Sequence, residues 1–202
     1  MVDVGPAPGT LEEPDPRVER SRRVILEAVL EELGDVGYGA LTIEGVAARA
    51  GVGKPSIYRR WSNKGLLVWE AVLGKTVSAP LPDSGKIEDD LRTVLHWGFD
   101  MVALPEARAA LPGMLADFRA NPELERLVRE RLLEPEYARI RTVFERAIER
   151  GDVRADVDLN VVMDTMIGLM LGCALMFVRP IDDALVEELV DLVLQGVRPR
   201  GS

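Results

Sequence analysis

The chain has 202 residues, of which 47% are hydrophobic and 29% are charged, and its formal net charge is −9. This composition is that of a globular rather than a disordered protein, and the length suits one ordinary domain or a small domain joined to a larger one. The only cysteine, Cys173, excludes an intramolecular disulfide bond and favours the reducing cytoplasm. One histidine and one cysteine also exclude a standard zinc site.

The charge is distributed unevenly along the chain. Residues 1–16 carry four acidic and no basic side chains and are predicted to be a disordered tail. Residues 17–78 carry ten Lys and Arg against seven Asp and Glu, whereas residues 79–202 carry fifteen against twenty-three. Because DNA responds to the local potential rather than to the total charge, the segment 17–78 is compatible with DNA binding.

Apolar residues recur with helical spacing along the N-terminal part. The predicted helices there span residues 18–33, 43–49, 55–60 and 63–77. The glycines between Gly34 and Gly39 end the first helix, Thr42 is placed to cap the second, and Ser62 is placed to cap the fourth. Residues 79–85 contain two prolines and a glycine, so we expect a linker and a domain boundary there.

The C-terminal part, residues 79–198, is predicted to be a larger helical domain. Its expected helices span residues 86–104, 106–119, 123–150, 158–178 and 182–197. Pro135 predicts a kink or a break near Glu134, and Gly151 is expected to end that helix.

Residues 165–178 form a nearly unbroken apolar run. A membrane-spanning helix needs about 20 such residues, and Asp164 and Arg179 limit the run on either side. We therefore expect a buried core or dimer helix and no membrane partner.

Residues 41–67 carry the functional signal. Two short predicted helices joined by Gly51-Val52-Gly53 form a helix-turn-helix pattern, and Gly51 can adopt the positive φ of a sharp reversal. Small residues in the first helix would let the second cross it closely, namely Gly45, Ala47, Ala48 and Ala50.

The second helix carries side chains that suit a DNA major groove. Lys54, Arg59 and Arg60 can contact guanine edges or phosphates, and the hydroxyls of Ser56 and Tyr58 can contact phosphates. At the start of the next helix, a further cation, that of Lys64, lies beside backbone N–H groups that favour phosphate. A solvated short helix in a helical bundle is the alternative, but the cap, the turn and the basic helix occur together within 27 residues.

Residues 17–77 resemble the DNA-binding domain of the TetR (tetracycline repressor) family. The resemblance rests on residues 42–58, TIEGVAARAGVGKPSIY, on Trp61, where the family usually carries an aromatic residue, and on Lys64. It implies a homodimer that places two recognition helices in successive major grooves of a roughly palindromic operator. It also implies DNA contacts by Thr42, Lys54, Ser56, Tyr58 and Lys64, with Arg59 and Arg60 as further candidates.

The resemblance further implies that the C-terminal domain binds an effector and dimerises. In the family, the last two long helices, here within residues 158–197, form a four-helix bundle across a two-fold axis, and Gly168 and Gly172 would permit a close approach. An ordinary monomer core is the alternative. Pliable methionines suit a pocket for varied apolar ligands, although core packing also explains each residue. The candidate pocket residues are Trp97, Met101, Met114, Phe118, Phe144, Met163, Met166, Met170 and Phe177.

The sequence therefore predicts an all-α protein with an N-terminal three-helix helix-turn-helix DNA-binding domain and a larger helical ligand-binding and dimerisation domain. Its expected function is that of a cytoplasmic, ligand-responsive repressor that a small apolar or amphipathic effector releases from double-stranded operator DNA. The coupling between the domains is expected to run through the helix at residues 86–104 and the fourth and first helices. No phosphate-binding loop, nucleophile elbow or His-Glu-x-x-His motif indicates an enzyme, and no cofactor is expected.

Two alternatives remain open. One is a helical dimeric interaction protein without DNA binding, and the other is a small-molecule carrier or enzyme that uses the C-terminal cavity. The sequence does not distinguish repression from activation.

Overall fold

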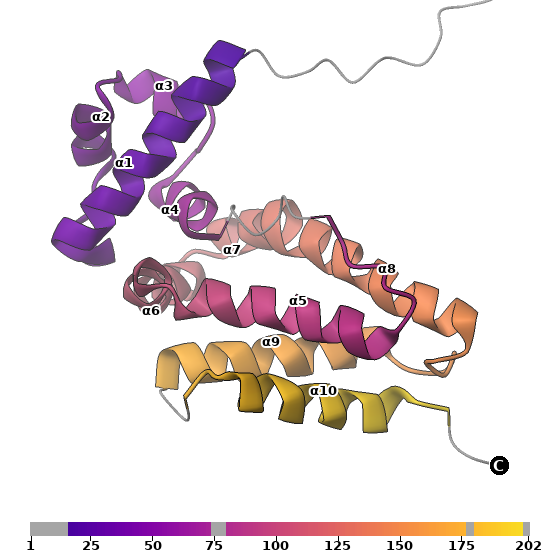
Figure 1. Cartoon of the computed structure of the whole chain (residues 1–202). Helices are drawn as coiled ribbons and strands as arrows, with labels where there is room; N and C mark the ends of the chain where they lie inside the picture. The colour runs from indigo at the N-terminus through magenta and orange to yellow at the C-terminus, as the bar shows by residue number, and fades with distance from the viewer. Residues whose placement is uncertain (1–15, 74–79, 177–179, 200–202) are drawn as a thin grey trace, which may run out of the picture.

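The computed structural model describes residues 16–73, 80–176 and 180–199. These residues form helices joined by turns and irregular segments, with no strand among them, so the predicted all-α class is confirmed (Figure 1). The predicted tail lies outside the described residues except for Pro16, and so does Phe177.

Four helices form the N-terminal part, and α1 packs against both α2 and α4. They are α1 (Pro16–Ala40), α2 (Ile43–Ala50), α3 (Lys54–Tyr58) and α4 (Lys64–Leu73). Their shared core contains Ile25 and Val29 of α1, Val46 of α2, Ile57 of α3 and Leu67 of α4, each at 0% exposure. The apolar faces that the sequence pattern predicted therefore meet in one core.

The helix ends agree with the sequence prediction at most positions. α1 extends to Ala40, but Gly37 leaves the helical conformation with φ 73°, so the regular helix ends within the predicted glycine segment. The Thr42 hydroxyl accepts a hydrogen bond from Gly45 N at 3.1 Å and caps α2 as predicted. The predicted cap of α4 is wrong by one residue: because the helix begins at Lys64, the side chain of Asn63 rather than Ser62 reaches a free backbone N–H, that of Leu66.

The C-terminal part is a bundle in which α5 is central, because it packs against α6, α8, α9 and α10 (Figure 1). Its helices are α5 (Ile87–Ala103), α6 (Pro105–Ala120), α7 (Pro122–Val128), the π-helical turn η2 (Arg129–Leu133), α8 (Glu134–Arg150), α9 (Leu159–Met176) and α10 (Asp183–Val197). The predicted kink or break near Glu134 corresponds to the π-helical turn η2, through which the backbone stays helical, and Pro135 follows in the first turn of α8. Gly151 ends α8 with φ 84°, as predicted.

The two parts of the chain meet mainly through α6. This helix packs against both α1 and α4, and α7 adds a smaller contact with α4. The expected connection through the helix at residues 86–104, now α5, is not among these main contacts. α5 packs chiefly against the other helices of its own bundle, and α6 makes the main contact with the N-terminal part.

Candidate DNA-binding surface

The turn between α2 and α3 is built on Gly51. Its φ of 65° lies in the left-handed region, which a residue without a Cβ adopts with little strain. Because the chain changes direction at Gly51, its backbone N donates a hydrogen bond to Ala48 O at 3.3 Å. The backbone N of Val52 donates to Ala47 O at 3.0 Å. α3 then begins at Lys54, with Pro55 in its first turn as predicted.

The small size of Gly45 has a different reason from the one predicted. A Cβ placed on Gly45 would lie 2.4 Å from Oε1 of Glu32, which belongs to α1. The missing side chain thus leaves room for a carboxylate of α1 rather than for α3. Glu32 uses this position to accept a hydrogen bond from Arg49 at 2.9 Å, which fastens α2 to α1.

α3 turns one side chain into the core and the others outward. Ile57 is fully buried, whereas Tyr58 is 50% exposed. At the start of α3, Nζ of Lys54 donates to Oε1 of Glu44 on α2 at 2.9 Å, and both side chains are more than half exposed. Ser56 accepts a hydrogen bond from Nη2 of Arg59 at 3.2 Å. Three of the predicted contact residues, Lys54, Tyr58 and Arg59, are therefore exposed, and Ser56 is partly buried.

Arg60 differs from these residues because its guanidinium turns toward the protein. Its Nη2 donates to Val18 O at 3.3 Å, and its Nη1 donates to Ser56 O at 3.3 Å. The side chain thus joins the end of α3 to the start of α1. The Arg60 side chain therefore helps to hold α3 in place against α1.

A second anchor fixes the segment that follows α3. Trp61 is 3% exposed, and its Nε1 donates to Oε2 of Glu70 at 2.6 Å. The other carboxylate oxygen of Glu70 accepts from Nε of Arg22 at 2.6 Å, so one side chain of α4 holds both α1 and the end of the helix-turn-helix. Hydrogen bonds to a charged group are stronger than those between neutral groups, so the partly buried Glu70 helps to hold α3 and the segment after it in place.

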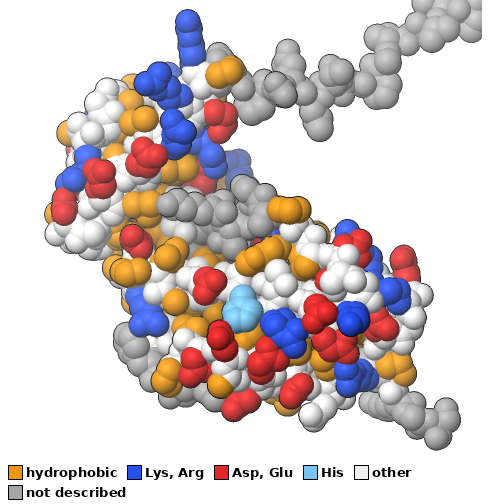
Figure 2. All heavy atoms as spheres, in the orientation of Figure 1, with side chains coloured by type: hydrophobic (Ala, Val, Ile, Leu, Met, Phe, Trp, Pro, Cys, Tyr) orange, Lys and Arg blue, Asp and Glu red, His pale blue; other side chains and the backbone are white. Residues whose placement is uncertain are grey.

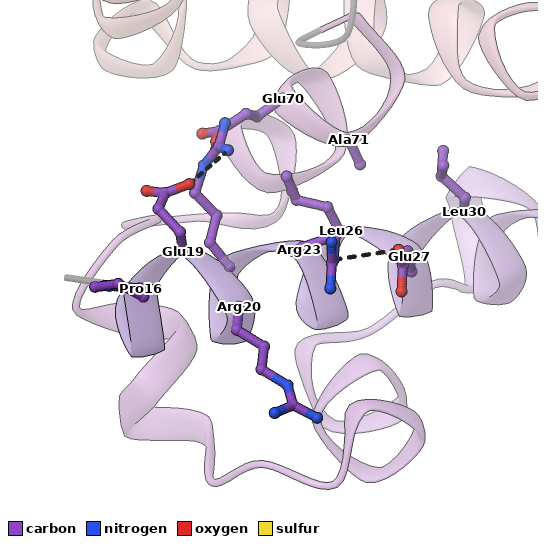
Figure 3. Close-up of a pocket in the computed structure, with 10 residues that line it drawn as sticks. Pro16, Glu19, Arg20, Arg23, Leu26, Glu27, Leu30, Glu70 and Ala71 are labelled. Atoms are coloured by element: carbon purple, nitrogen blue, oxygen red, sulfur yellow. Dashed lines mark hydrogen bonds and ion pairs between the residues drawn. The ribbon is translucent and has the colours of Figure 1, made fainter. Parts of the chain in front are cut away.

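A hollow of about 640 Å³ lies beside this anchor, between α1 and α4 (Figure 3). Leu26 and Leu30 of α1 and Ala71 of α4 supply its apolar wall. Its rim carries charges of both signs, and at one edge Arg22 forms ion pairs with Glu19 and Glu70. None of the predicted effector-pocket residues lines this hollow.

Lys64 occupies the first position of α4, but it also contacts the end of α1. Its Nζ donates to Tyr38 O at 3.0 Å and lies 4.3 Å from the centroid of the Tyr38 ring. An ammonium group has three N–H donors, so this contact leaves donors for a phosphate.

The surface charge is segregated between the two parts of the molecule. Figure 2 shows Lys and Arg side chains gathered at the end formed by the start of α1 and by α3, whereas Asp and Glu predominate over α5 and α10. A local excess of cations suits the DNA phosphates. On the face shown, the cations are therefore richest near α3 and the acidic side chains over α5 and α10.

The predicted effector-pocket residues lie where α5, α6, α8 and α9 converge. Five of them belong to the hydrophobic core: Met114, Phe118, Phe144, Met166 and Met170. Met163 is buried, and Trp97 and Met101 are partly buried. Met170 fills the space beside Gly98, because a Cβ on that glycine would lie 2.4 Å from the methionine sulfur.

Sequence reasoning missed the residues that position the predicted contacts, namely Tyr38, Glu44 and Glu70. Their partners lie 26, 10 and 9 residues away along the chain, on other helices or in a connecting segment. Helical periodicity carries no signal for such pairs. Only the abundance of glycine around Tyr38 indicated that the chain changes direction there.

The glycine turn, the exposed second helix and the attached helical bundle define a DNA-binding protein of the helix-turn-helix class. Residues 25–71 match the family of "Bacterial regulatory proteins, tetR family", and residues 81–193 match the "Tetracyclin repressor-like, C-terminal domain". The chain belongs to the TetR family of transcriptional regulators. This family is a class of regulators and not of enzymes.

Similar proteins include both sequences and a solved structure. The "DNA-binding transcriptional repressor TetR" of Mycobacteroides abscessus is 31% identical over 181 residues, which are 88% of this chain and 94% of that protein. The "Uncharacterized HTH-type transcriptional regulator YdeS" of Bacillus subtilis is 27% identical over 184 residues, 91% of this chain and 92% of that one. The crystal structure of the TetR family transcription regulator SCO0332 has a TM-score of 0.72 and 29% identity, covering 89% of this chain and 100% of that one.

Proposed function

We propose that the chain is a ligand-responsive repressor that binds double-stranded operator DNA as a homodimer in the cytoplasm. The observation that carries the proposal is the geometry of α3, which buries Ile57 and leaves Tyr58 half-exposed beside Lys54. Hydroxyl and ammonium groups in this arrangement suit phosphates and base edges in a major groove. A two-fold dimer would place two such helices in successive grooves, roughly 34–36 Å apart, and therefore selects an inverted repeat.

The proposed dimer contact uses α9 and α10. Val161, Met176 and Leu192 are 60%, 74% and 61% exposed, which is unusual for large apolar side chains. A Cβ on Gly168 or Gly172 would have no heavy atom of the described residues within 4 Å, so this side of α9 is open to a close-packing neighbour. By length and composition α9 could also cross a membrane. We assign its exposed face to a second copy of the chain, because the family assembles through these helices.

The proposed effector is small and apolar or amphipathic. The described buried side chains of α5, α6, α8 and α9 are apolar except for Asp90, and Met170 and Met166 are flexible enough to yield to a ligand. Binding there would shift the population toward a state whose two recognition helices no longer match successive grooves. The position of α6, which contributes Met114 and Phe118 and also packs against α1 and α4, supports this coupling.

Selection of binding sites from random duplex DNA tests the DNA-binding part of the proposal. We expect an enriched inverted repeat, and we expect Tyr58→Ala to bind it more weakly than the wild type. Tyr58→Phe is the matched control, because it keeps the ring and removes only the hydroxyl. If no sequence is enriched and all three proteins bind DNA equally weakly, the chain is instead a helical interaction protein without a DNA-binding function.

The dimer is tested by sedimentation of a Leu192→Ala variant. Burying a leucine fully is worth about 1.5–3 kcal/mol, and 61% of Leu192 is exposed in the single chain. Two copies in a two-fold interface should therefore weaken the dimer by about 2–4 kcal/mol. Leu104→Ala, an exposed leucine between α5 and α6, is the control that should not change the dimer. Equal dissociation constants for the two variants would contradict the assignment.

The effector class is tested with palmitate as an amphipathic probe. We expect it to raise the melting temperature of the protein and to release the selected operator, because a ligand that favours one state shifts both equilibria. Substituting Met170→Trp, which fills the space beside Gly98, should abolish both effects. A screen that yields only strongly charged ligands would contradict an apolar pocket.

A further inference from the structure

Tyr38 lies at the point where the DNA-binding helices meet the C-terminal bundle. Gly37, with φ 73°, turns the chain at the end of α1, and the Tyr38 side chain that follows is only 5% exposed. Its neighbours come from two directions. Lys64 of α4 lies on one side, and Gly113 and Asp117 of α6 lie on the other.

The contact with α6 is close and specific. The Tyr38 hydroxyl donates a hydrogen bond to Oδ2 of Asp117 at 2.7 Å. A Cβ placed on Gly113 would lie 2.4 Å from Cδ1 and 3.1 Å from Cε1 of the Tyr38 ring. An aromatic ring cannot bend away from such a contact, so even alanine at position 113 would displace either the ring or α6.

The contact with α4 holds a candidate DNA-binding group. Nζ of Lys64 donates to Tyr38 O at 3.0 Å and lies over the ring, 4.3 Å from its centroid, where a cation is attracted to the π-face. The next residue, Gly65, approaches α7 so closely that a Cβ on it would lie 3.1 Å from Cδ2 of Leu124. The first turn of α4 is thus placed by Tyr38 on one side and by the C-terminal bundle on the other.

We propose that Tyr38 is a positioning residue for Lys64, and that α6 determines where the Lys64 ammonium lies by holding Tyr38 through Gly113 and Asp117. The proposal rests on the proposed function in one respect, since it takes Lys64 as a phosphate contact. It adds a specific physical link: the ammonium of Lys64, which is predicted to touch DNA, is held by Tyr38, and Tyr38 is held by α6. Any movement of α6 relative to α1 changes the place of the ring and of the backbone carbonyl that bind Nζ.

The consequence is measurable as the number of phosphate contacts. Each contact contributes about 0.9 to the slope of log K against log salt concentration. If displacement of Tyr38 removes the Lys64 contact, the slope becomes shallower by about 0.9 for each protomer. A merely structural role for Tyr38 would lower the stability of the protein and leave this slope unchanged.

The test uses the full chain and the operator selected with the wild-type protein. Gly113→Ala should lower the affinity several-fold and make the salt slope shallower by the amount that Lys64→Met does. Gly34→Ala is the matched control, because this glycine also lies in a helix but a Cβ there would meet nothing within 4 Å. Combining Gly113→Ala with Lys64→Met should cause no further loss, because both changes remove the same contact.

Two results would overturn the proposal. One is a Gly113→Ala protein with the wild-type slope, and the other is a double variant whose losses are additive. If Gly113→Ala does not fold, as judged by circular dichroism, Tyr38→Leu replaces it, because leucine fills the buried space but offers no π-face to the ammonium. A wild-type slope for a folded Tyr38→Leu protein would equally refute the link. If the wild type itself selects no operator, the proposed function fails first, and that outcome is recognised before any variant is made.

Discussion

The Glu44–Lys54 ion pair places a negative charge on the predicted DNA-binding surface, and its removal should strengthen DNA binding. The hydrogen bond from Lys54 holds the pKa of Glu44 below its ordinary value, so this carboxylate is ionised at neutral pH. It repels phosphates and also offsets the positive charge of Lys54, whose Nζ lies 2.9 Å from Oε1 of Glu44. Glu44→Gln keeps the shape of the side chain and removes both effects.

The size of the effect follows from counterion release. A Lys54 whose positive charge is no longer offset by Glu44 can neutralise one phosphate, which adds about 0.9 per protomer to the salt slope. Between 50 and 200 mM salt, each added contact therefore changes the affinity by about threefold, and the two contacts of a dimer by about tenfold. We expect Glu44→Gln to bind DNA more tightly than the wild type at 50 mM salt, with the two proteins converging as the salt concentration rises.

Fluorescence anisotropy with the selected operator and with an unrelated duplex measures these slopes. Glu187→Gln is the control, because it removes an exposed carboxylate that also pairs with a cation, Arg92, but lies on α10, away from α3 (Figure 1). The control should change neither slope. If Glu44→Gln weakens binding to the operator alone, the carboxylate accepts a hydrogen bond from a base, and the reasoning from repulsion is refuted.

Two further predictions concern stability. Thr42→Ala removes the side-chain cap of α2, so urea denaturation should show an unfolding free energy lower by about 1 kcal/mol; an unchanged value would show that the cap is replaced by solvent at no cost. Burial, and then the hydrogen bond to Asp117, raise the pKa of Tyr38 above 10.0. The stability from this group is complete below pH 10 and is lost as the pH rises further, because the unfolded chain releases the proton first. The unfolding free energy of Tyr38→Phe should therefore fall less above about pH 10 than that of the wild type. An equal fall in the two proteins would contradict this prediction.

Much of the fold could be predicted because its signals act over a few residues. Thr42 caps α2, and Gly51 and Gly151 adopt positive φ at the ends of their helices, as their sequence context indicates. Where two neighbours have similar capping ability, as Ser62 and Asn63 do, the local signal cannot decide between them. The position of the helix start then decides, and it depends on how α4 packs.

The sequence predicted which residues belong to the candidate site but not how their side chains are arranged in space. Lys54, Tyr58 and Arg59 are exposed as expected and Ser56 is partly buried, since Ile57 is the one side chain of the five-residue α3 that enters the core. Arg60 turns instead toward Val18 O, 42 residues earlier in the chain. No local pattern distinguishes this arginine from its neighbour.

The sequence by itself determined the helical class, the helix-turn-helix and the family, because apolar periodicity, helix caps and glycine turns depend on residues only a few positions apart. Only the tertiary structure showed that α6 makes the main contact with the DNA-binding helices. It also showed that Tyr38 contacts both Lys64 and Asp117, the latter 79 positions further along the chain. Such contacts depend on the angles at which helices cross and on the side-chain rotamers that close packing permits. These quantities are properties of the assembled core, and no single helix contains them.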